Sequence, residues 1–454
     1  MAQSNHHKLA EGSVRESLIR MTTPMIIGML MMFTFNIVDT LFISFLGTDP
    51  LTAISFTFPV GFTILSLAIG LGIGASAVVA KYLGRGEIER AKEAATVINY
   101  ISATMASLMI VLCWIFLDEI FRLLGAGDDM LVLIREFMVV WLPGSLLIVC
   151  MMTGNAILRA GGNTKTPSML MAFAGFSNAV LDPLLIFGLG PFPALGIQGA
   201  AWATVISWAM AFAYLYRLLI FKQEMISRKF PSPEVMATSG REMLRIGIPA
   251  AGANMMTPLA AGVMTAIAAG FGNSAVAAFG VGGRIEPIAT LLVLAMSTSL
   301  PPLISQNYGA GHVHRVAEAY RIAIRFVLIW QLLLYGVLAL LAPLIAEIFS
   351  DDAEVIHTIQ LFLWILPLGY GMQGVIILTN SSLNALHQPM SALWLSIARF
   401  FVFYVPLAWL GSVYFGLWGF FGGAVAGNLL MGLISLAAFN RAVNAELRLQ
   451  EKTA

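Results

Sequence analysis

Two aspartates stand inside long apolar stretches of the chain, where an ionisable group is costly. Asp39 lies in Phe-Asn-Ile-Val-Asp-Thr at 35–40, and Asp182 lies in Phe-Ser-Asn-Ala-Val-Leu-Asp-Pro at 176–183. A carboxylate at the centre of a membrane helix costs roughly 2.5–3.5 kcal/mol on the lenient insertion scale. We therefore expect both side chains to face the protein interior and to find partners there. Burial away from cations favours the neutral form of a carboxyl group, so such a pair can take up and release protons.

Neutral polar residues accompany the two acids. Asn178 and Asp182 are four residues apart and share one helix face. Pro183 cannot bond to the carbonyl of Ala179, which leaves that oxygen free one turn from Asp182. Asn and Thr side chains also tie membrane helices together without any further role. For Asn36, Asn155 and Thr204, helix packing and ion coupling both stay open as interpretations. The further candidates for coupling to protons or cations are Asn36, Thr40, Asn155 and Thr204.

Methionine and phenylalanine crowd the same stretches. The chain has 25 Met and 29 Phe. Flexible thioethers form surfaces that repack around different guests, although most of these side chains taken singly fit lipid contact or packing equally well. As a group beside the acids they indicate a promiscuous apolar substrate cavity. Its candidate residues are Met25, Met29, Met32, Phe35, Phe173 and Met256.

Motifs for other chemistry are missing from the sequence. Neither a Ser-His-Asp order nor a Walker sequence nor a His-x-x-x-His pair occurs, and His312 and His314 lack a third metal ligand. Cys113 and Cys150 give no disulfide framework or zinc spacing. The net charge of +1 offers no basic excess for nucleic acid. We expect no enzyme activity, cofactor, metal or nucleic-acid partner.

The elements that must position the acids are membrane helices. Of 454 residues 59% are hydrophobic and only 11% charged, against about 25% charged in an ordinary soluble domain. Mean hydropathy is +0.85, so a soluble protein is excluded. A helix needs roughly 20 apolar residues to cross a membrane. Twelve stretches satisfy this, near 18–44, 52–80, 94–117, 131–157, 166–189, 196–221, 241–270, 275–304, 320–346, 353–384, 389–412 and 417–441.

Positive charges predict the orientation of these helices. Most of the 25 Lys and Arg residues fall at the two ends of the chain and in every second loop. Loops rich in Lys and Arg stay in the cytoplasm. We therefore expect cytoplasmic termini, an even number of spans and a plasma membrane location, with residues 1–17 carrying no cleavable signal peptide.

The chain repeats itself at an offset of 225 residues. Pro24 falls on Pro249, the loop at 84–93 on that at 309–318, and Asn155 on Asn380. A two-residue deletion near Gly162 then puts Pro183 on Pro406, Gly196 on Gly419 and Gly199 on Gly422. This predicts two parallel six-helix lobes with a substrate site between them. The expected boundaries are an N-terminal segment 1–17, an N-lobe 18–221, a linker 222–240, a C-lobe 241–441 and a tail 442–454.

The repeat breaks at the acids. Asp39 maps to Met264, Asp182 to Val405, and Asn178 to Phe401. Residues that serve structure are duplicated, whereas the buried carboxylates are not, so the coupling chemistry is predicted to lie in the first lobe.

With twelve spans in two repeats, the segment Leu-Arg-Ala-Gly-Gly-Asn-Thr-Lys-Thr-Pro at 158–167 and the Gly-x-Gly-x-x-x-Arg loops, the chain resembles the multidrug and toxic compound extrusion (MATE) transporters over residues 12–445. The first-lobe acids resemble the DinF-type branch. That resemblance implies a protonation or cation site made by Asp39, Asn178 and Asp182, with Asn155 and Thr204 as further members. It also implies that the first helix bends at Pro24 when the site is protonated.

A departure from the NorM-type branch accompanies this resemblance. That branch keeps acids in its second lobe, whereas the corresponding position here is Thr257, and the tenth span has no acid between Leu361 and Leu386. Arg284 and Glu286, which open the eighth span, are either an interfacial pair or a second charged site.

The expected function is proton-coupled antiport of apolar or cationic drug-like compounds by a monomer in a bacterial inner membrane, in contact with lipids. Sodium coupling through the same oxygens is one alternative. The other is flipping of lipid-linked precursors, which needs a cationic cavity, although the only cations inside the spans are Arg284 and Arg399.

Overall fold

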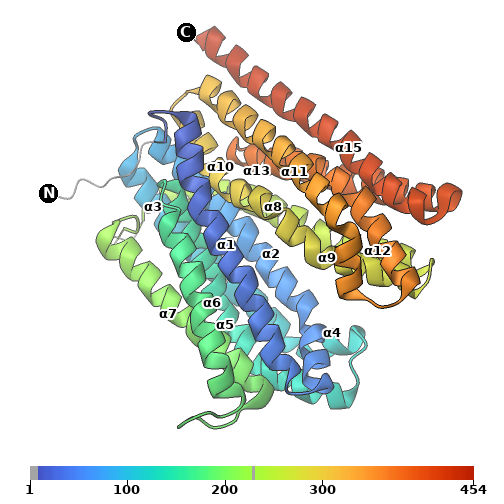
Figure 1. The fold of residues 1–454 in the computed structure, drawn as a ribbon. Coiled ribbons are helices and arrows are strands. Elements are labelled where there is room, and N and C mark those ends of the chain that lie inside the picture. The colour runs from blue at the N-terminus through green and yellow to red at the C-terminus, as the bar shows by residue number, and fades with distance from the viewer. Residues whose placement is uncertain (1–8, 228–230, 454) are drawn as a thin grey trace. The chain divides into compact units, whose positions relative to one another are not determined.

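The computed structural model describes residues 9–227 and 231–453, and every regular element in these two ranges is helical. Figure 1 shows the long helices. In chain order they begin with α1 (Val14–Ser44), α2 (Thr48–Gly84), α3 (Ile88–Ile115), the short α4 (Leu117–Leu123), α5 (Asp128–Ala160), α6 (Lys165–Ile186) and α7 (Gly196–Arg217), which the π-helical turn η1 (Leu218–Lys222) extends.

The second half has the same kind of elements. It contains α8 (Pro233–Ala269), α9 (Asn273–Ala289), α10 (Leu291–Gly309), α11 (Val313–Phe349), α12 (Ala353–Ile365), the 3₁₀ turn η2 (Leu366–Gly369), α13 (Tyr370–Ala385), α14 (Pro389–Ala398), the π-helical turn η3 (Arg399–Tyr404) and α15 (Val405–Thr453).

These helices account for all twelve predicted spans. Ten helical stretches of the described chain are long and apolar enough to cross a membrane, and α9 and α10, bent by 45°, form one further broken span. The stretch Pro389–Glu451 has 63 residues, about 95 Å of helix against a hydrocarbon core of about 30 Å. It bends at Phe415 and Gly416, where Gly416 has φ 59°. That stretch is therefore two spans, as expected from 389–412 and 417–441.

The chain forms two compact units that exchange short segments. Residues 23–251 belong to the first unit, and residues 10–22 together with the chain from Gly252 onward belong to the second. The division falls inside α1, just before Pro24, and inside α8, just after Pro249. The start of α8 at Pro233 also lies within the stretch expected as a linker. The lobe boundaries drawn from the sequence stay a prediction.

Close helix packing holds the start of α8 in the first unit. A Cβ atom at Gly74 would lie 2.6 Å from the carbonyl oxygen of Met243, and one at Gly70 would collide with Gly247. Gly70 and Gly74 of α2 therefore allow close approach of the two helices. Lys81 Nζ also lies 2.5 Å from Glu242 Oε1 across the same pair of helices.

The segment 10–22, which includes the start of α1, forms hydrogen bonds with other residues of the second unit. The hydroxyl groups of Thr22 and Ser299 are 2.7 Å apart, and both residues are buried. Arg315 Nη1 donates to the carbonyl of Gly12 at 2.8 Å. Helix α1 thus has separate attachments on either side of the division next to Pro24.

Candidate functional site

Within the first unit, α1 and α6 run in the same direction. Their contacts show this, since residues further along α1 contact residues further along α6. The hydroxyl of Ser168 donates to the carbonyl oxygen of Pro24. Further along, Asp39 meets Asp182. Between and beyond these contacts, the ring centroids of Phe35 and Phe176 are 6.3 Å apart and those of Phe42 and Phe187 are 6.4 Å apart. One interface therefore connects the acids to the proline.

The two aspartates interact directly with one another. Asp182 is fully buried and Asp39 is partly buried. Asp39 Oδ1 and Asp182 Oδ2 are buried, and no donor for either oxygen occurs among the described residues. Two carboxyl groups this close repel one another when both are ionised, so a proton or a bound cation stabilises the pair.

Asn178 connects this pair to α7. Its Nδ2 lies 3.3 Å from Asp182 Oδ1 and 3.3 Å from Thr204 Oγ1. Thr204 Oγ1 in turn donates to the carbonyl of Ala200 at 3.0 Å. The structure thus brings together Asp39, Asp182, Asn178 and Thr204 from three helices, which we call the aspartate cluster.

Two predicted members lie apart from the aspartate cluster. Asn155, in α5, is 4% exposed and its Oδ1 is buried without a donor in the described chain. No hydrogen bond found in the described residues joins it to either aspartate. The side chain of Asn36 is exposed, and its backbone carbonyl accepts a bond of 2.9 Å from Thr40 Oγ1. Their roles stay a prediction.

Pro24 lies in an α1 that is helical throughout. Its ring nitrogen cannot donate, so the carbonyl of Arg20 loses its usual helical partner. Ser168, which the sequence did not single out although it follows the segment 158–167 directly, fixes the carbonyl of Pro24 to α6. Its hydroxyl also lies 3.9 Å from Met25 Sδ.

The model of the MatE family matches residues 24–184 and again 249–410. The chain belongs to the MatE family. The two matches begin 225 residues apart, which agrees with the offset of the internal repeat.

Relatives of this MatE chain are membrane transporters. The FAD transporter of Shewanella oneidensis is 40% identical over 429 residues, covering 94% of this chain and 95% of that protein. The multidrug export protein MepA of Staphylococcus haemolyticus is 24% identical over 410 residues, and the alignment covers 90% of this chain and 89% of that protein. Among solved structures, the bent form of the Vibrio cholerae MATE transporter VcmN is 33% identical and superposes with a TM-score of 0.91. The match covers 95% of this chain and 98% of that chain. The protein is thus a multi-pass, all-helical MATE transporter.

The methionines and phenylalanines predicted to line a substrate cavity differ in exposure within this MATE fold. Met25 and Met29 are 1% and 9% exposed, whereas Phe173 is 45% exposed. Phe35 packs on Phe176. Met32 is partly buried, and Met256 belongs to the second unit. Their part in binding substrate stays a prediction.

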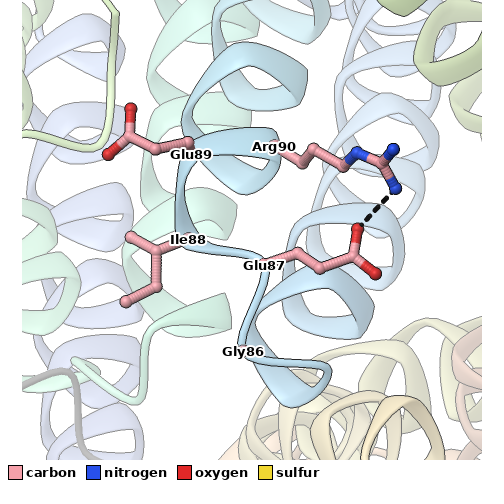
Figure 2. A pocket seen from close by; sticks show the side chains of 5 residues that line it. All are labelled: Gly86, Glu87, Ile88, Glu89 and Arg90. Atoms are coloured by element: carbon pink, nitrogen blue, oxygen red, sulfur yellow. Dashed lines mark hydrogen bonds and ion pairs between the residues drawn. The ribbon is translucent and has the colours of Figure 1, made fainter.

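A surface depression lies at the turn between α2 and α3 of the MATE chain. Figure 2 shows the residues that line it, Gly86, Glu87, Ile88, Glu89 and Arg90. Arg90 Nη1 donates to Glu87 Oε2 at 2.9 Å, and the side chain of Arg90 is 67% exposed. Asp39 precedes the start of α2, whereas the depression follows the end of that helix. Helix α2 has 37 residues, which corresponds to a length of about 55 Å. It is a solvated turn and not part of the aspartate cluster.

Proposed function

We propose that the chain is a proton-coupled exporter of apolar or cationic drug-like compounds and that the aspartate cluster is its proton site. The observation that carries this proposal is the contact between Asp39 and Asp182 inside an apolar helix bundle, with a buried oxygen on each that lacks a donor in the described chain. A proton taken up there removes one of two repelling charges. Asp39 belongs to α1 and Asp182 to α6. The charge of the pair therefore changes the repulsion between these two helices.

The coupling step follows from that interface. Protonation of Asp39 and Asp182 lets α1 and α6 approach more closely at their acid end, and α1 yields at Pro24, where a helical hydrogen bond is missing. The bend shrinks the space beside the aspartate cluster and expels the substrate; release of the proton to the cytoplasm resets the cycle. A bent form of the related VcmN transporter supports the view that this fold admits such a change.

The remaining assignments rest on the same residues. We place the chain in the DinF-type branch because its acids lie in the first half of the repeat, and we expect a monomer with both termini in the cytoplasm of a bacterial inner membrane. The candidate positions for contact with substrate are the Met and Phe residues named above in α1 and α6, together with Met256 of α8.

Export of a fluorescent cation such as ethidium from energised cells tests the proposal. Asp39→Asn keeps the size of the side chain and removes the proton site, so export should fall about tenfold or more at equal protein level. Asp49→Asn is the matched control, since Asp49 is exposed at the start of α2 and should leave export unchanged. Normal export by Asp39→Asn would remove Asp39 from the mechanism.

A second candidate substrate is flavin adenine dinucleotide (FAD). The S. oneidensis relative, 40% identical over 94% of this chain, is named an FAD transporter. FAD has flat rings that suit apolar and sulfur-containing side chains and a pyrophosphate that needs a cation. Accumulation of FAD in the medium of cells that express the chain, compared with cells that express Asp39→Asn, tests this substrate. Equal amounts in both media would exclude it.

A further inference from the structure

The second unit contains a buried polar cluster that the proton site does not use. Its members come from four elements of that unit and lie far apart in the sequence. They are Glu286 of α9, Tyr370 and Gln373 of α13, Arg399 and Tyr404 of η3, and Asn428 of α15. We call them the Arg399 cluster.

Arg399 is a buried cation that has no ion pair within residues 9–227 and 231–453. Its side chain is 8% exposed, and its Nε donates to Asn428 Oδ1 at 3.3 Å. In the described part of the chain it forms no further hydrogen bond and has no carboxylate within 4.0 Å. A guanidinium group has five N–H donors, so most of its capacity is unused. Buried charges in proteins are normally paired, whereas Glu286 acts on this charge only through space and no anion of the described chain bonds to the guanidinium.

A second buried donor shares the electrostatic neighbours of Arg399, since Glu286 and Tyr404 act on Tyr370 as well. Tyr370 is 1% exposed, and its hydroxyl has no hydrogen-bond partner among the described residues. Glu286 is near enough to act electrostatically on both Tyr370 and Arg399, but its Oε1 accepts from Gln373 Nε2 at 2.5 Å instead. The cluster therefore offers two kinds of buried donor, a guanidinium and a phenol.

The local backbone and the neighbouring rings favour this arrangement. Arg399 begins a π-helical turn, a form that recurs at functional sites because it widens the helix. The Arg399 guanidinium carbon lies 4.6 Å from the ring centre of Phe400 and 6.0 Å from that of Tyr404. Aromatic rings on its sides hold a guanidinium in place while its edge stays available for a planar pair of oxygens.

We propose that the Arg399 cluster binds a phosphoryl or pyrophosphate group of the transported substrate, through the guanidinium of Arg399 and the hydroxyl of Tyr370. This inference rests on the proposed function, because it assumes that the chain carries a small molecule. Glu286 opposes the same anion through its charge and thereby sets the affinity. The cluster thus selects substrates that bear phosphate.

Binding of inorganic pyrophosphate to the purified full-length protein tests the proposal without any transport step. Arg399→Gln should weaken pyrophosphate binding about tenfold or more, since charge-assisted bonds are lost. Glu286→Gln, which removes only the opposing charge, should tighten it several-fold. Sodium sulfate at equal ionic strength is the control for non-specific binding. Equal affinity of the wild type and Arg399→Gln, or no binding to the wild type, would overturn the proposal.

The two variants act in opposite directions, so the test survives a folding defect. If Arg399→Gln melts earlier than the wild type or aggregates, Glu286→Gln decides alone, and unchanged or weaker pyrophosphate binding to it overturns the proposal. Asp39→Asn should bind pyrophosphate as the wild type does while failing to export. Loss of coupling and loss of anion binding are therefore separate results.

Three further probes distinguish the possible sources of the phosphate. FAD and riboflavin share the flavin ring, and only FAD carries the pyrophosphate. A preference for FAD that Arg399→Gln abolishes supports a soluble dinucleotide. A preference for farnesyl pyrophosphate, again lost in Arg399→Gln, supports a lipid-linked diphosphate. If the wild type and Arg399→Gln bind all three probes with equal affinity, the proposed phosphate site is contradicted.

Discussion

The two halves of the chain share a framework and differ in their polar interiors. Asp39 and Asp182 form a carboxylate pair in the first unit, whereas the repeat places Met264 and Val405 at the equivalent positions of the second. Met264 is 0% exposed and belongs to an apolar core. The Arg399 cluster, by contrast, has no charged counterpart in the first half, where Phe176 stands in the place of Arg399. Duplication has preserved the helices and left each interior free to acquire its own chemistry.

The polar residue that both halves keep behaves differently from the acids. Asn155 and its counterpart Asn380 each have a buried Oδ1 without a donor in the described chain. Asn380 Nδ2 donates to Ser396 Oγ at 2.9 Å, a bond between neighbouring helices. A residue kept at the same place in both repeats, and bonded across helices in one, fits a structural role better than ion coupling.

The largest expected effect separates the acid from its counterpart. Asp182→Asn should reduce substrate export about tenfold or more, because the bundle loses half of its carboxylate pair. Val405→Asn places the same side chain at the equivalent position of the second half and should change export less than about twofold. The measurement is dye efflux at matched protein levels. Similar losses in both variants would break the asymmetry.

A second comparison concerns the two repeated prolines, Pro24 and Pro249. Pro24→Ala restores a helical donor in α1, so the protein should become more heat-stable, while the export rate falls about fivefold because α1 resists bending. Pro249→Ala removes the equivalent proline of α8 and should leave the export rate near that of the wild type. Thermal unfolding and efflux, measured on both variants, check this pair. A greater loss of export in Pro249→Ala would move the hinge to α8.

The smallest effect is expected at the ion pair between Asp118 of α4 and Arg135 of α5. The guanidinium of Arg135 holds the pKa of the Asp118 carboxyl below its ordinary value of 3.8. A lowered pKa stabilises the folded state above the unfolded-state pKa, and the contribution disappears as the pH falls through the folded-state pKa. Arg135→Gln should therefore lower the melting temperature on the order of 1 °C at pH 7, and this difference should shrink as the pH falls below 3.8. A difference that stays constant with pH would contradict this ion pair.

Much of this architecture could be predicted from the sequence because it depends on local signals. Apolar length predicts each span, and the offset of 225 residues, which the two family matches share, predicts the duplication. The pairing of Asn178 with Asp182 follows from helical spacing alone. The break of the eighth span between α9 and α10, next to Pro287, was not expected, since periodicity does not reveal a 45° bend.

Contacts between distant residues are what the sequence could not provide. Glu286, Arg399 and Asn428 lie in different helices with no fixed spacing, so nothing in the chain groups them before it folds. Ser168 was missed for the same reason, because its partner Pro24 is 144 residues away. The sequence did single out Arg399 as a rare cation in a span, which is the signal from which the cluster could have been suspected.

The most direct test of the account is substrate efflux from proteoliposomes that contain the purified protein, under an imposed pH gradient with acid outside and without sodium. Proton coupling through the aspartate cluster predicts efflux that follows the proton gradient, is unaffected by added sodium, and is lost in Asp39→Asn. Efflux that ignores the pH gradient and requires an inward sodium gradient would contradict proton coupling through the aspartate cluster.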